Sequence, residues 1–189
     1  MMSGIVQLES ARLILRQWRD SDLPAFADMC ADPRVMRYFP ETLSRLESAA
    51  VIGRVRGHFA ELGYGLWALE RKDSGQFIGF TGLGQVGFDA PFAPATEIGW
   101  RLAYEHWGLG FASEAAWTCL NCAFGRLDMD EVVAFTAAAN LGSEKVMQSI
   151  GMLRDLDGDF DHPKLPGHEL QRHMLYRITR EQWQRTLQG

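Results

Sequence analysis

Cysteine is scarce in this sequence, and positive charge is not in excess. The 189 residues include three cysteines and carry a formal net charge of −5. An odd number of cysteines without a secretory signal argues against a disulfide framework and predicts a reduced, cytoplasmic setting. A mildly acidic chain also lacks the basic footprint of a nucleic-acid-binding protein. Disulfide scaffolds and nucleic-acid binders are therefore disfavoured.

Long apolar runs, internal repeats, low-complexity tracts and linkers are also missing. No stretch is long and apolar enough to span a bilayer, so no membrane partner is expected. The residues from Met1 to Gln7 lack the apolar run of a signal peptide. What is present is a chain that is 47% hydrophobic. Its size and composition predict one domain with one core, spanning residues 1–189.

Alternating apolar residues predict seven strands, and spacings of three and four predict helices between them. The predicted strands cover residues 12–16, 65–70, 77–83, 97–102, 131–137, 152–156 and 170–178. The polar, turn-rich segment from Asp157 to Gly167 is predicted to be a long exposed loop. Mixed strands and helices without repeats predict one α/β domain with a mixed, largely antiparallel central sheet.

The stretch from Glu97 to Ala116 is the most informative part of the chain. Ile98, Trp100 and Leu102 alternate with their neighbours as in a strand, and a helical pattern begins after a glycine-rich turn. Glycines in such a turn let successive N–H groups point at one spot. That spot lies at the positive end of the following helix, which favours an anion. The turn is therefore predicted to hold a pyrophosphate.

Two common nucleotide motifs do not fit this turn. The dinucleotide fingerprint places its first glycine directly after a strand, whereas Ala103 to Trp107 intervene here. It also needs an acidic residue at the end of the next strand, whereas Asp130 and Glu131 stand at its start. The P-loop ends in Gly-Lys-Ser/Thr, which Gly110 and its successors do not supply.

Four short motifs in order resemble the GCN5-related N-acetyltransferases (GNAT). They are Glu97-x-Gly99-Trp100, then Trp107-Gly108-Leu109-Gly110-Phe111-Ala112-Ser113-Glu114-Ala115, then Asn140-x-x-Ser143, then Gly151-Met152. Each motif alone is weak, but the set at these spacings is specific. The match is closest to the branch that acetylates ribosomal-protein N-terminal alanine, and it extends from about Leu13 to Tyr176.

The resemblance implies a fold and a co-substrate. The sheet would splay open between the Glu97 strand and the Glu131 strand, with helices on both faces, and the pantetheine arm of acetyl-CoA would enter the gap. The main chain of Trp100 to Leu102 would pair with that arm, and the glycine turn would hold the pyrophosphate. The predicted cofactor-binding residues are Trp100, Arg101, Leu102, Trp107, Gly108, Leu109, Gly110, Phe111, Ala112, Ser113 and Asn140. No metal is implied, and homodimers are common among such relatives.

Glu97 is the predicted general base. It lies on the strand face opposite Ile98 and Trp100, and partial burial would raise its pKa toward neutrality. Two structural alternatives remain open from the residues. Glu97 is either an ordinary exposed strand residue, or it pairs with its same-face neighbour Arg101. The motif of the resembling family favours the base, acting through a water molecule.

Ser143 is the predicted acid, or a stabiliser of the leaving thiolate. Other branches of the superfamily place a tyrosine seven residues after the asparagine, but Met147 stands there and cannot donate a proton. The structural alternative for Ser143 is a local hydrogen bond in the first turn of a helix. Asn140 would cap that helix, contact the cofactor, or do both.

Two further patterns contain residue types used in redox or metal sites, but neither fits such a site. Cys119-x-x-Cys122 has redox or zinc spacing, but it falls in the middle of a predicted helix and has no partner pair. The group Asp159, Asp161 and His162 matches no metal template. Because its loop joins the last two strands, it would instead help to select a cationic amine or a peptide N-terminus.

The sequence thus predicts an enzyme that moves an acetyl group from acetyl-CoA to a primary amine within a ternary complex. The acceptor, whether a protein N-terminus, a polyamine, an amino acid or a drug amine, is left open. Two alternatives are a catalytically silent acyl-CoA-binding module on the same fold and a nucleotide-binding oxidoreductase. The misplaced acidic residue at Asp130 disfavours the second.

Overall fold

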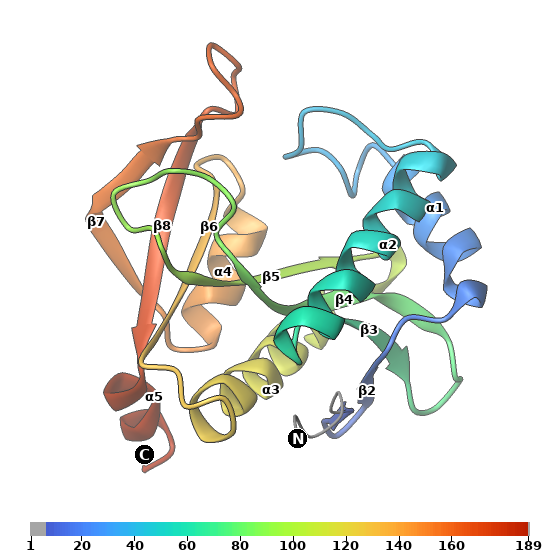
Figure 1. Cartoon of the computed structure of the whole chain (residues 1–189), viewed down its shortest axis with the longest axis horizontal. Helices are drawn as coiled ribbons and strands as arrows, with labels where there is room; N and C mark the ends of the chain where they lie inside the picture. The colour runs from blue at the N-terminus through green and yellow to red at the C-terminus, as the bar shows by residue number, and fades with distance from the viewer. Residues whose placement is uncertain (1–6, 189) are drawn as a thin grey trace.

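Eight strands form one open sheet in the order β1-β2-β3-β4-β5-β6-β8-β7 (Figure 1). The computed structural model describes residues 7–188. Of the segment from Met1 to Gln7, for which no signal peptide is predicted, only Gln7 lies within the described residues. The strands are β1 (Leu8–Glu9), β2 (Leu13–Arg16), β3 (Leu66–Arg71), β4 (Phe77–Gln85), β5 (Thr96–Leu102), β6 (Glu131–Ala137), β7 (Leu153–Asp161) and β8 (Arg172–Thr179). All neighbouring strands pair antiparallel except β5 and β6, which are parallel. The predicted mixed, mostly antiparallel sheet is confirmed.

The described part of the chain also contains five α-helices and two short 3-10 turns, which connect the strands except for the last helix, which follows β8. They are η1 (Asp20–Asp22), α1 (Leu23–Ala31), α2 (Arg45–Leu62), η2 (Tyr104–His106), α3 (Phe111–Gly125), α4 (Leu141–Ser149) and α5 (Arg180–Thr186). Capping boxes start α2 at Ser44 and α5 at Thr179, and Gly63 ends α2 with a φ of 76°. These local signals fix the helix limits because they satisfy terminal N–H and C=O groups. Within residues 7–188, no helix is long and apolar enough to cross a membrane.

The two faces of the sheet carry different helices. Arg101 of β5 contacts Cys30 of α1, so its alternating neighbours Ile98 and Leu102 face the other side. Those two residues are buried in the core that also includes the inner side of α3. Figure 1 accordingly shows α1 and α2 on one side of β4 and β5, and α3 on the other. The prediction of helices on both faces is confirmed.

The pairing of β5 with β6 covers a single residue pair, Glu97 with Val133. By contrast, β4 and β5 pair over seven residues from Gly79 with Leu102 to Gln85 with Thr96. The two central strands therefore separate beyond Glu97. This is the predicted splay, and it leaves main-chain groups of β5 without a ladder partner.

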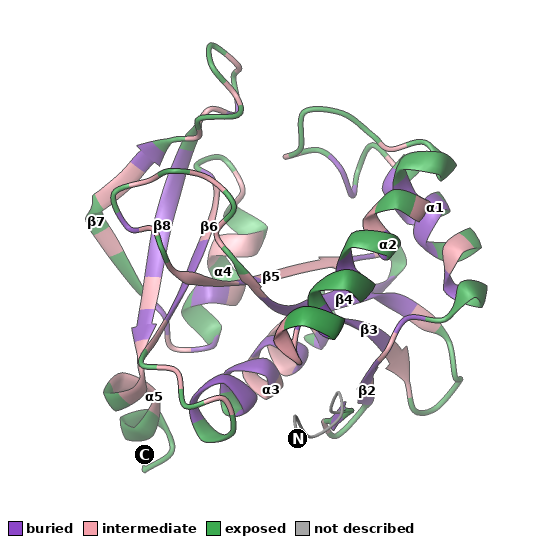
Figure 2. Ribbon diagram, in the orientation of Figure 1, coloured by how far each residue is buried: buried purple, intermediate pink, exposed green. Residues whose placement is uncertain are grey.

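The last third of the chain differs from the sequence prediction. The segment from Asp157 to Asp161 belongs to β7 and is not part of an exposed loop, and the connection to β8 is correspondingly shorter. β7 is an edge strand that pairs only with β8 among the described residues. Many of its residues are therefore polar, and the alternation of apolar and polar residues that indicates a strand is weak. A register shift between Asp155 and Phe160 further breaks the alternation. Figure 2 shows this edge largely exposed beside the buried β6 and β8.

Candidate active site

The glycine turn has the backbone geometry of an anion cradle. Gly108 and Gly110 have φ values of 72° and 80°, which side-chain-bearing residues rarely adopt. A Cβ at Gly108 would meet nothing within 4 Å, so the space beside the turn is open. Since α3 begins at Phe111, the N–H groups of its first turn have no intrahelical acceptor. Trp107, Leu109 and Gly110 are exposed next to these donors.

An ion pair between Arg12, which directly precedes β2, and Glu114 of α3 holds this turn in place. The main-chain N–H of Arg12 donates to Glu114 Oε1 at 2.7 Å, and Arg12 Nε donates to Oε2 at 2.7 Å. Arg12 Nη1 also donates to the carbonyl of Leu109, inside the turn, at 2.9 Å. Glu114 belongs to the glycine-turn motif, but the motif alone indicates no role for it. No local signal could reveal the contact, because the two residues are 102 positions apart.

Ser113 lies where α3 meets α4. Its hydroxyl is 2.8 Å from the hydroxyl of Ser149, near the end of α4, and Ser149 donates to the carbonyl of Val146 at 2.7 Å. Ala112 and Ser113 are both half-buried. The predicted phosphate contact of Ser113 thus sits on the α3–α4 side of the sheet, beside the glycine turn.

Hydrogen bonds at the two ends of β5 show which main-chain groups face the gap. Val86 N–H donates to Ala95 C=O and Ala103 N–H donates to Ile78 C=O, both at 3.0 Å and both between β5 and the β4 side. Because antiparallel partners alternate, the odd-numbered residues of β5 face β4 and the even-numbered ones face β6. Trp100 and Leu102 therefore present main-chain groups to the gap.

The main chain of Arg101 is turned toward β4 by the same alternation. The carbonyl of Leu102 accepts from Trp107 Nε1 at 2.9 Å, which ties the strand end to the glycine turn. Of the three β5 residues predicted to bind the cofactor, the geometry thus places Trp100 and Leu102 toward the gap and Arg101 away from it.

The start of α4 combines a helix cap with a free hydroxyl. Asn140 Oδ1 accepts from the N–H of Ser143 at 3.2 Å, so Asn140 is the N-cap. Asn140 Nδ2 donates to Ser143 Oγ at 3.1 Å and to Thr136 Oγ1 at 3.0 Å. The Ser143 hydroxyl is therefore an acceptor within the protein. Its own proton has no acceptor in the described part of the chain, and it remains available to donate.

Glu97 is half-buried on β5, and its carboxyl group has a pKa near neutrality. Burial raises the pKa of its carboxyl group from the ordinary value of 4.5 to about 7, and the positive charge of Lys164 acts in the opposite direction. The neighbouring position on β4 is Gly84, and a Cβ there would meet only Glu97 Oε1, at 4.0 Å. The alternative of an ordinary exposed strand residue is thereby ruled out.

The second alternative for Glu97, an ion pair with Arg101, is also ruled out. Arg101 Nη1 donates to Cys30 Sγ at 3.3 Å, and the guanidinium lies over the rings of Phe39 at 4.2 Å and Phe80 at 5.3 Å. Burial lowers the pKa of Arg101, while Cys30 raises it. The carboxylate and the guanidinium thus share one face of β5 without contacting each other.

An aromatic wall stands beside Glu97 on that face. Phe88, in the β4–β5 connection, contacts Phe135 of β6 at 5.5 Å and His162 at 4.5 Å between ring centroids. His162 in turn lies 4.9 Å from His173 of β8. Burial lowers the pKa of both histidines, so both rings are neutral at pH 7. The wall is therefore apolar and uncharged around neutral pH.

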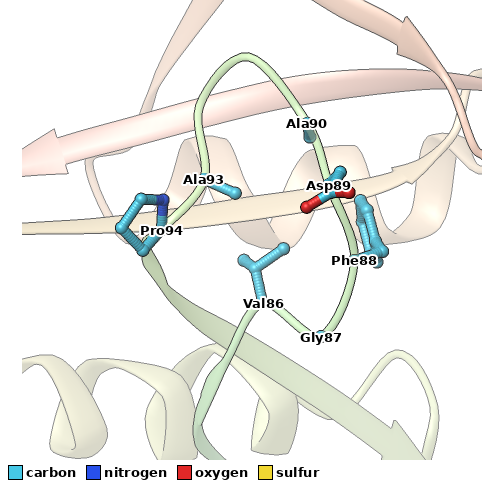
Figure 3. Close-up of a pocket in the computed structure, with 7 residues that line it drawn as sticks. All are labelled: Val86, Gly87, Phe88, Asp89, Ala90, Ala93 and Pro94. Atoms are coloured by element: carbon cyan, nitrogen blue, oxygen red, sulfur yellow. The ribbon is translucent and has the colours of Figure 1, made fainter.

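The β4–β5 connection itself borders an open pocket of about 410 Å³ (Figure 3). Val86 and Ala93 point into the middle of this loop, and Asp89 faces them from the opposite limb. Gly87, Phe88, Ala90 and Pro94 complete the lining. A small, half-apolar hollow with one carboxylate thus adjoins the aromatic wall.

The residues proposed to select a cationic acceptor have mostly structural partners. Asp159 accepts from Arg154 at 2.6 Å, and Asp161 accepts from Arg172 at 3.3 Å. Only His162 of that group joins the aromatic wall. The two carboxylates therefore lie on β7 in ion pairs. Of the three residues, only His162 is still a candidate for contacting the acceptor.

The cysteine pair has no reactive environment. Cys119 and Cys122 are free and buried within α3, and burial raises the pKa of each thiol. Within residues 7–188, no group of His, Cys, Asp or Glu side chains could hold a metal ion.

The geometry gathers the predicted residues on two sides of one gap. The glycine turn, Ser113, Asn140 and Ser143 lie with α3 and α4. Glu97 lies on the opposite face, with Val133 paired beside it and the aromatic wall beyond. Acid and base candidates thus stand on either side of β5 and β6, where the sheet is open.

Comparison with known proteins agrees with this arrangement. The family model of the acetyltransferase (GNAT) domain matches residues 12–153. The uncharacterized N-acetyltransferase YnaD of Bacillus subtilis is 29% identical over 180 residues, covering 94% of this chain and 99% of that protein. The crystal structure of an acetyltransferase from Agrobacterium tumefaciens is 26% identical, with a TM-score of 0.75, covering 94% and 96% of the two chains.

A structure of Mycobacterium smegmatis RimJ in complex with CoA-disulfide has a TM-score of 0.76 at 16% identity, covering 97% of this chain and 94% of that one. At that identity the likeness shows the fold alone. The family model covers most of the chain, and the fold and the site geometry agree with it. The chain therefore belongs to the GNAT family of acetyltransferases.

Proposed function

We propose that this protein transfers the acetyl group of acetyl-CoA to a primary amine by direct attack in a ternary complex. The observation that carries the proposal is the placement of Glu97, with its pKa of about 7, and Ser143 on either side of the β5–β6 gap. Amine acetylation needs a base for the amine and a donor for the leaving thiolate. Both kinds of group are present where two central strands separate.

The residues present fit acetyl-CoA at the α3–α4 side. The N–H groups from Gly108 to Ser113 suit a pyrophosphate, because they combine a glycine turn with a helix start. The gap-facing main chain of Trp100 and Leu102 suits the amides of pantetheine, as in strand addition. When bound, acetyl-CoA supplies an acetyl group activated as a thioester.

Glu97 takes the proton that the attacking amine loses, directly or through a water molecule. A carboxylate with a pKa of about 7 is partly ionised at neutral pH and basic enough to accept that proton. Its half-buried position limits competition from bulk water.

Ser143 supports the departure of the thiolate. Its hydroxyl proton is free because Asn140 already satisfies its oxygen from the other side. A serine is a weak acid, so its main effect is a hydrogen bond to the developing negative charge. Asn140 orients this hydroxyl while it caps α4. An N–H of β5 that faces the gap, such as that of Leu102, is the candidate for stabilising the carbonyl oxygen.

The acceptor side favours an amine that docks against an aromatic wall. The four motifs that resemble the ribosomal-protein branch support a protein N-terminus as one acceptor class. The aromatic wall and the small pocket in the β4–β5 connection suit a small-molecule amine equally well. Three free, buried cysteines are compatible with a reduced, cytoplasmic setting.

The first test is thermal unfolding with acetyl-CoA, with NAD as the control ligand. At ~100 times its Kd, a ligand adds about 2.7 kcal/mol of stability. At about 2–4 °C per kcal/mol this predicts a rise of roughly 5–10 °C. Acetyl-CoA should produce it and NAD should not. No rise at saturating acetyl-CoA would contradict the proposal.

The second test separates an enzyme from a silent acyl-CoA-binding module. Thiol release from acetyl-CoA should depend on an added amine drawn from peptides, polyamines, amino acids and aminoglycosides. A thermal rise without thiol release for any amine would favour the silent module. Release that continues at the same rate without an amine would indicate hydrolysis and would also count against the proposal.

A further inference from the structure

Arg101 differs from the other shielded arginines of this protein. Among the described residues, four other arginines are buried or half-buried, and each pairs with a carboxylate: Arg16 with Asp22, Arg71 with Asp73, Arg177 with Glu131 and Arg180 with Asp128. Arg101 has only Cys30 Sγ and the rings of Phe39 and Phe80. A shielded charge without a counter-ion is costly, and ring contacts offset only part of that cost. An anion would complete this site.

The donors of Arg101 that remain free define where an anion would bind. Nη1 is engaged with Cys30, and Nε is enclosed without an acceptor. Nη2 is not enclosed and has no acceptor within residues 7–188. Phe39, which covers one side of the guanidinium, is itself 38% exposed. Nη2 is therefore the donor of Arg101 that a ligand could reach.

The sheet surface between Arg101 and Glu97 is bare. The one residue between them on that face of β5 is Gly99, and a Cβ there would meet nothing within 4 Å. Opposite Glu97 lies Gly84, whose Cβ would meet only the Glu97 carboxylate. The space above Gly99 is thus open between a carboxylate that suits an amine and a guanidinium that suits an anion. Four residues of extended strand separate the two Cα atoms by roughly 13 Å.

We propose that the acceptor is an amine that carries a carboxylate several bonds from its nitrogen. The nitrogen lies at Glu97, the chain of the acceptor crosses Gly99, and the carboxylate pairs with the guanidinium of Arg101. This inference rests on the proposed acetyl transfer and names the acceptor class for the same site. Planar guanidinium donors suit a carboxylate, and such charged hydrogen bonds are strong.

The test uses matched acceptors with and without the charge. Thiol release from acetyl-CoA is compared for glycine, 4-aminobutanoate and 6-aminohexanoate, each against its own primary amide. We expect kcat/KM to favour the acid over the amide by at least about tenfold for the longer acceptors, since a charged hydrogen bond has that magnitude. Glycine should show the smallest preference, because it is too short to reach both groups. Equal rates for acids and amides at every length would overturn the inference while leaving acetyl transfer intact.

The variant Arg101→Gln should bring the ratio of acid to amide close to one. Arg37→Gln is the matched control, because Arg37 is exposed, its guanidinium lies over Tyr38, and it has no carboxylate partner among the described residues. It removes the same charge and should leave the ratio unchanged. If both variants changed the ratio equally, a general field effect would replace the specific pairing, and the inference would fail.

A measurement independent of activity separates the two proposals. Isothermal titration of 6-aminohexanoate into the protein saturated with CoA should show binding that Arg101→Gln abolishes. Were no amine acetylated, such Arg101-dependent binding would still support the carboxylate site. Absence of binding together with normal acetylation of amides would refute it. If Arg101→Gln does not fold, judged by its thermal transition, Arg101→Lys serves instead, and it should lower the ratio of acid to amide severalfold.

Discussion

The two sides of the β5–β6 gap are built from different kinds of group. On the α3–α4 side the candidate contacts are main-chain N–H groups of the glycine turn and the neutral side chains of Ser113, Asn140 and Ser143. On the opposite side the candidates are ionisable, with Glu97 at one end of a bare strand and Arg101 at the other. The candidate contacts on the first side are uncharged, whereas those on the second side are ionisable.

This difference separates two tasks. Main-chain groups at a helix start bind a pyrophosphate whatever the surrounding side chains are, so that side suits a ligand that never changes. Charged side chains in partial burial respond strongly to small changes in their surroundings. We therefore expect acceptor choice and pH response to reside on the Glu97 side, and co-substrate affinity to reside on the α3–α4 side.

The largest expected effect comes from removing the base. Glu97→Gln should lower kcat by about 10²–10⁴-fold, the usual contribution of a general base. In the wild type, kcat/KM should fall about tenfold per pH unit below pH 7, because the carboxyl group is then protonated. The variant should lose this inflection. Thiol-release rates measured between pH 5.5 and 9 provide the check.

The affinity for acetyl-CoA should survive this substitution if the two sides act separately. Glu169→Gln, which removes an exposed carboxylate from the β7–β8 connection, is the matched control and should leave the rate unchanged. A Glu97→Gln variant that keeps both its rate and its pH profile would remove Glu97 from the mechanism and would show that the pH response does not reside on this side of the gap.

A smaller effect is expected on the neutral side. Ser143→Ala should lower kcat by roughly tenfold, the magnitude of one hydrogen bond to a charged group. The α4 cap should persist, because Asn140 accepts from the main-chain N–H of residue 143. Steady-state kinetics at saturating acetyl-CoA provide the measurement. Ser143→Thr, which keeps a hydroxyl group, should retain most of the activity, and equal loss in both variants would point to packing instead.

A last effect concerns stability and tests the raised pKa of Glu97 directly. Between pH 4.5 and about 7, folded Glu97 keeps a proton that the unfolded chain releases, so rising pH lowers the free energy of unfolding. Glu97→Gln removes this loss. We therefore compare the free energy of unfolding of the variant with that of the wild type at each pH. Relative to wild type, the variant should be about 2 kcal/mol more stable at pH 8 than it is at pH 5.

Thermal melts at the two pH values test this, with roughly 2–4 °C expected per kcal/mol. A difference in melting temperature between variant and wild type that is the same at both pH values would mean that the pKa of Glu97 is not raised. The activity profile would then need another titrating group.

Much of the neutral side could be predicted from sequence, because its signals are local. A strand, two glycines and a helix start lie within about twenty residues, and the cap at Asn140 is visible from residue spacing. The splay beyond Glu97 followed from the family resemblance, and the single pair with Val133 confirms it. The capping boxes at Ser44 and Thr179 were predicted for the same local reason.

The charged side could be predicted only in part. Arg101 shares a strand face with Glu97, so spacing allowed an ion pair, but the contact with Cys30 depends on how α1 packs. The strand β7 was missed beyond Leu156 because an edge strand with a register shift keeps polar residues. The aromatic wall was missed too, since it joins residues from the β4–β5 connection, β6 and β8.

The contact between Arg12 and Glu114 also bears on how a nascent chain completes this protein. The two residues are 102 positions apart, so the first strands emerge from the ribosome long before α3 can reach them. The carbonyl of Leu109 is held by Arg12 only after that closure. The proposed co-substrate site is then complete only in a chain whose first strands have already met α3.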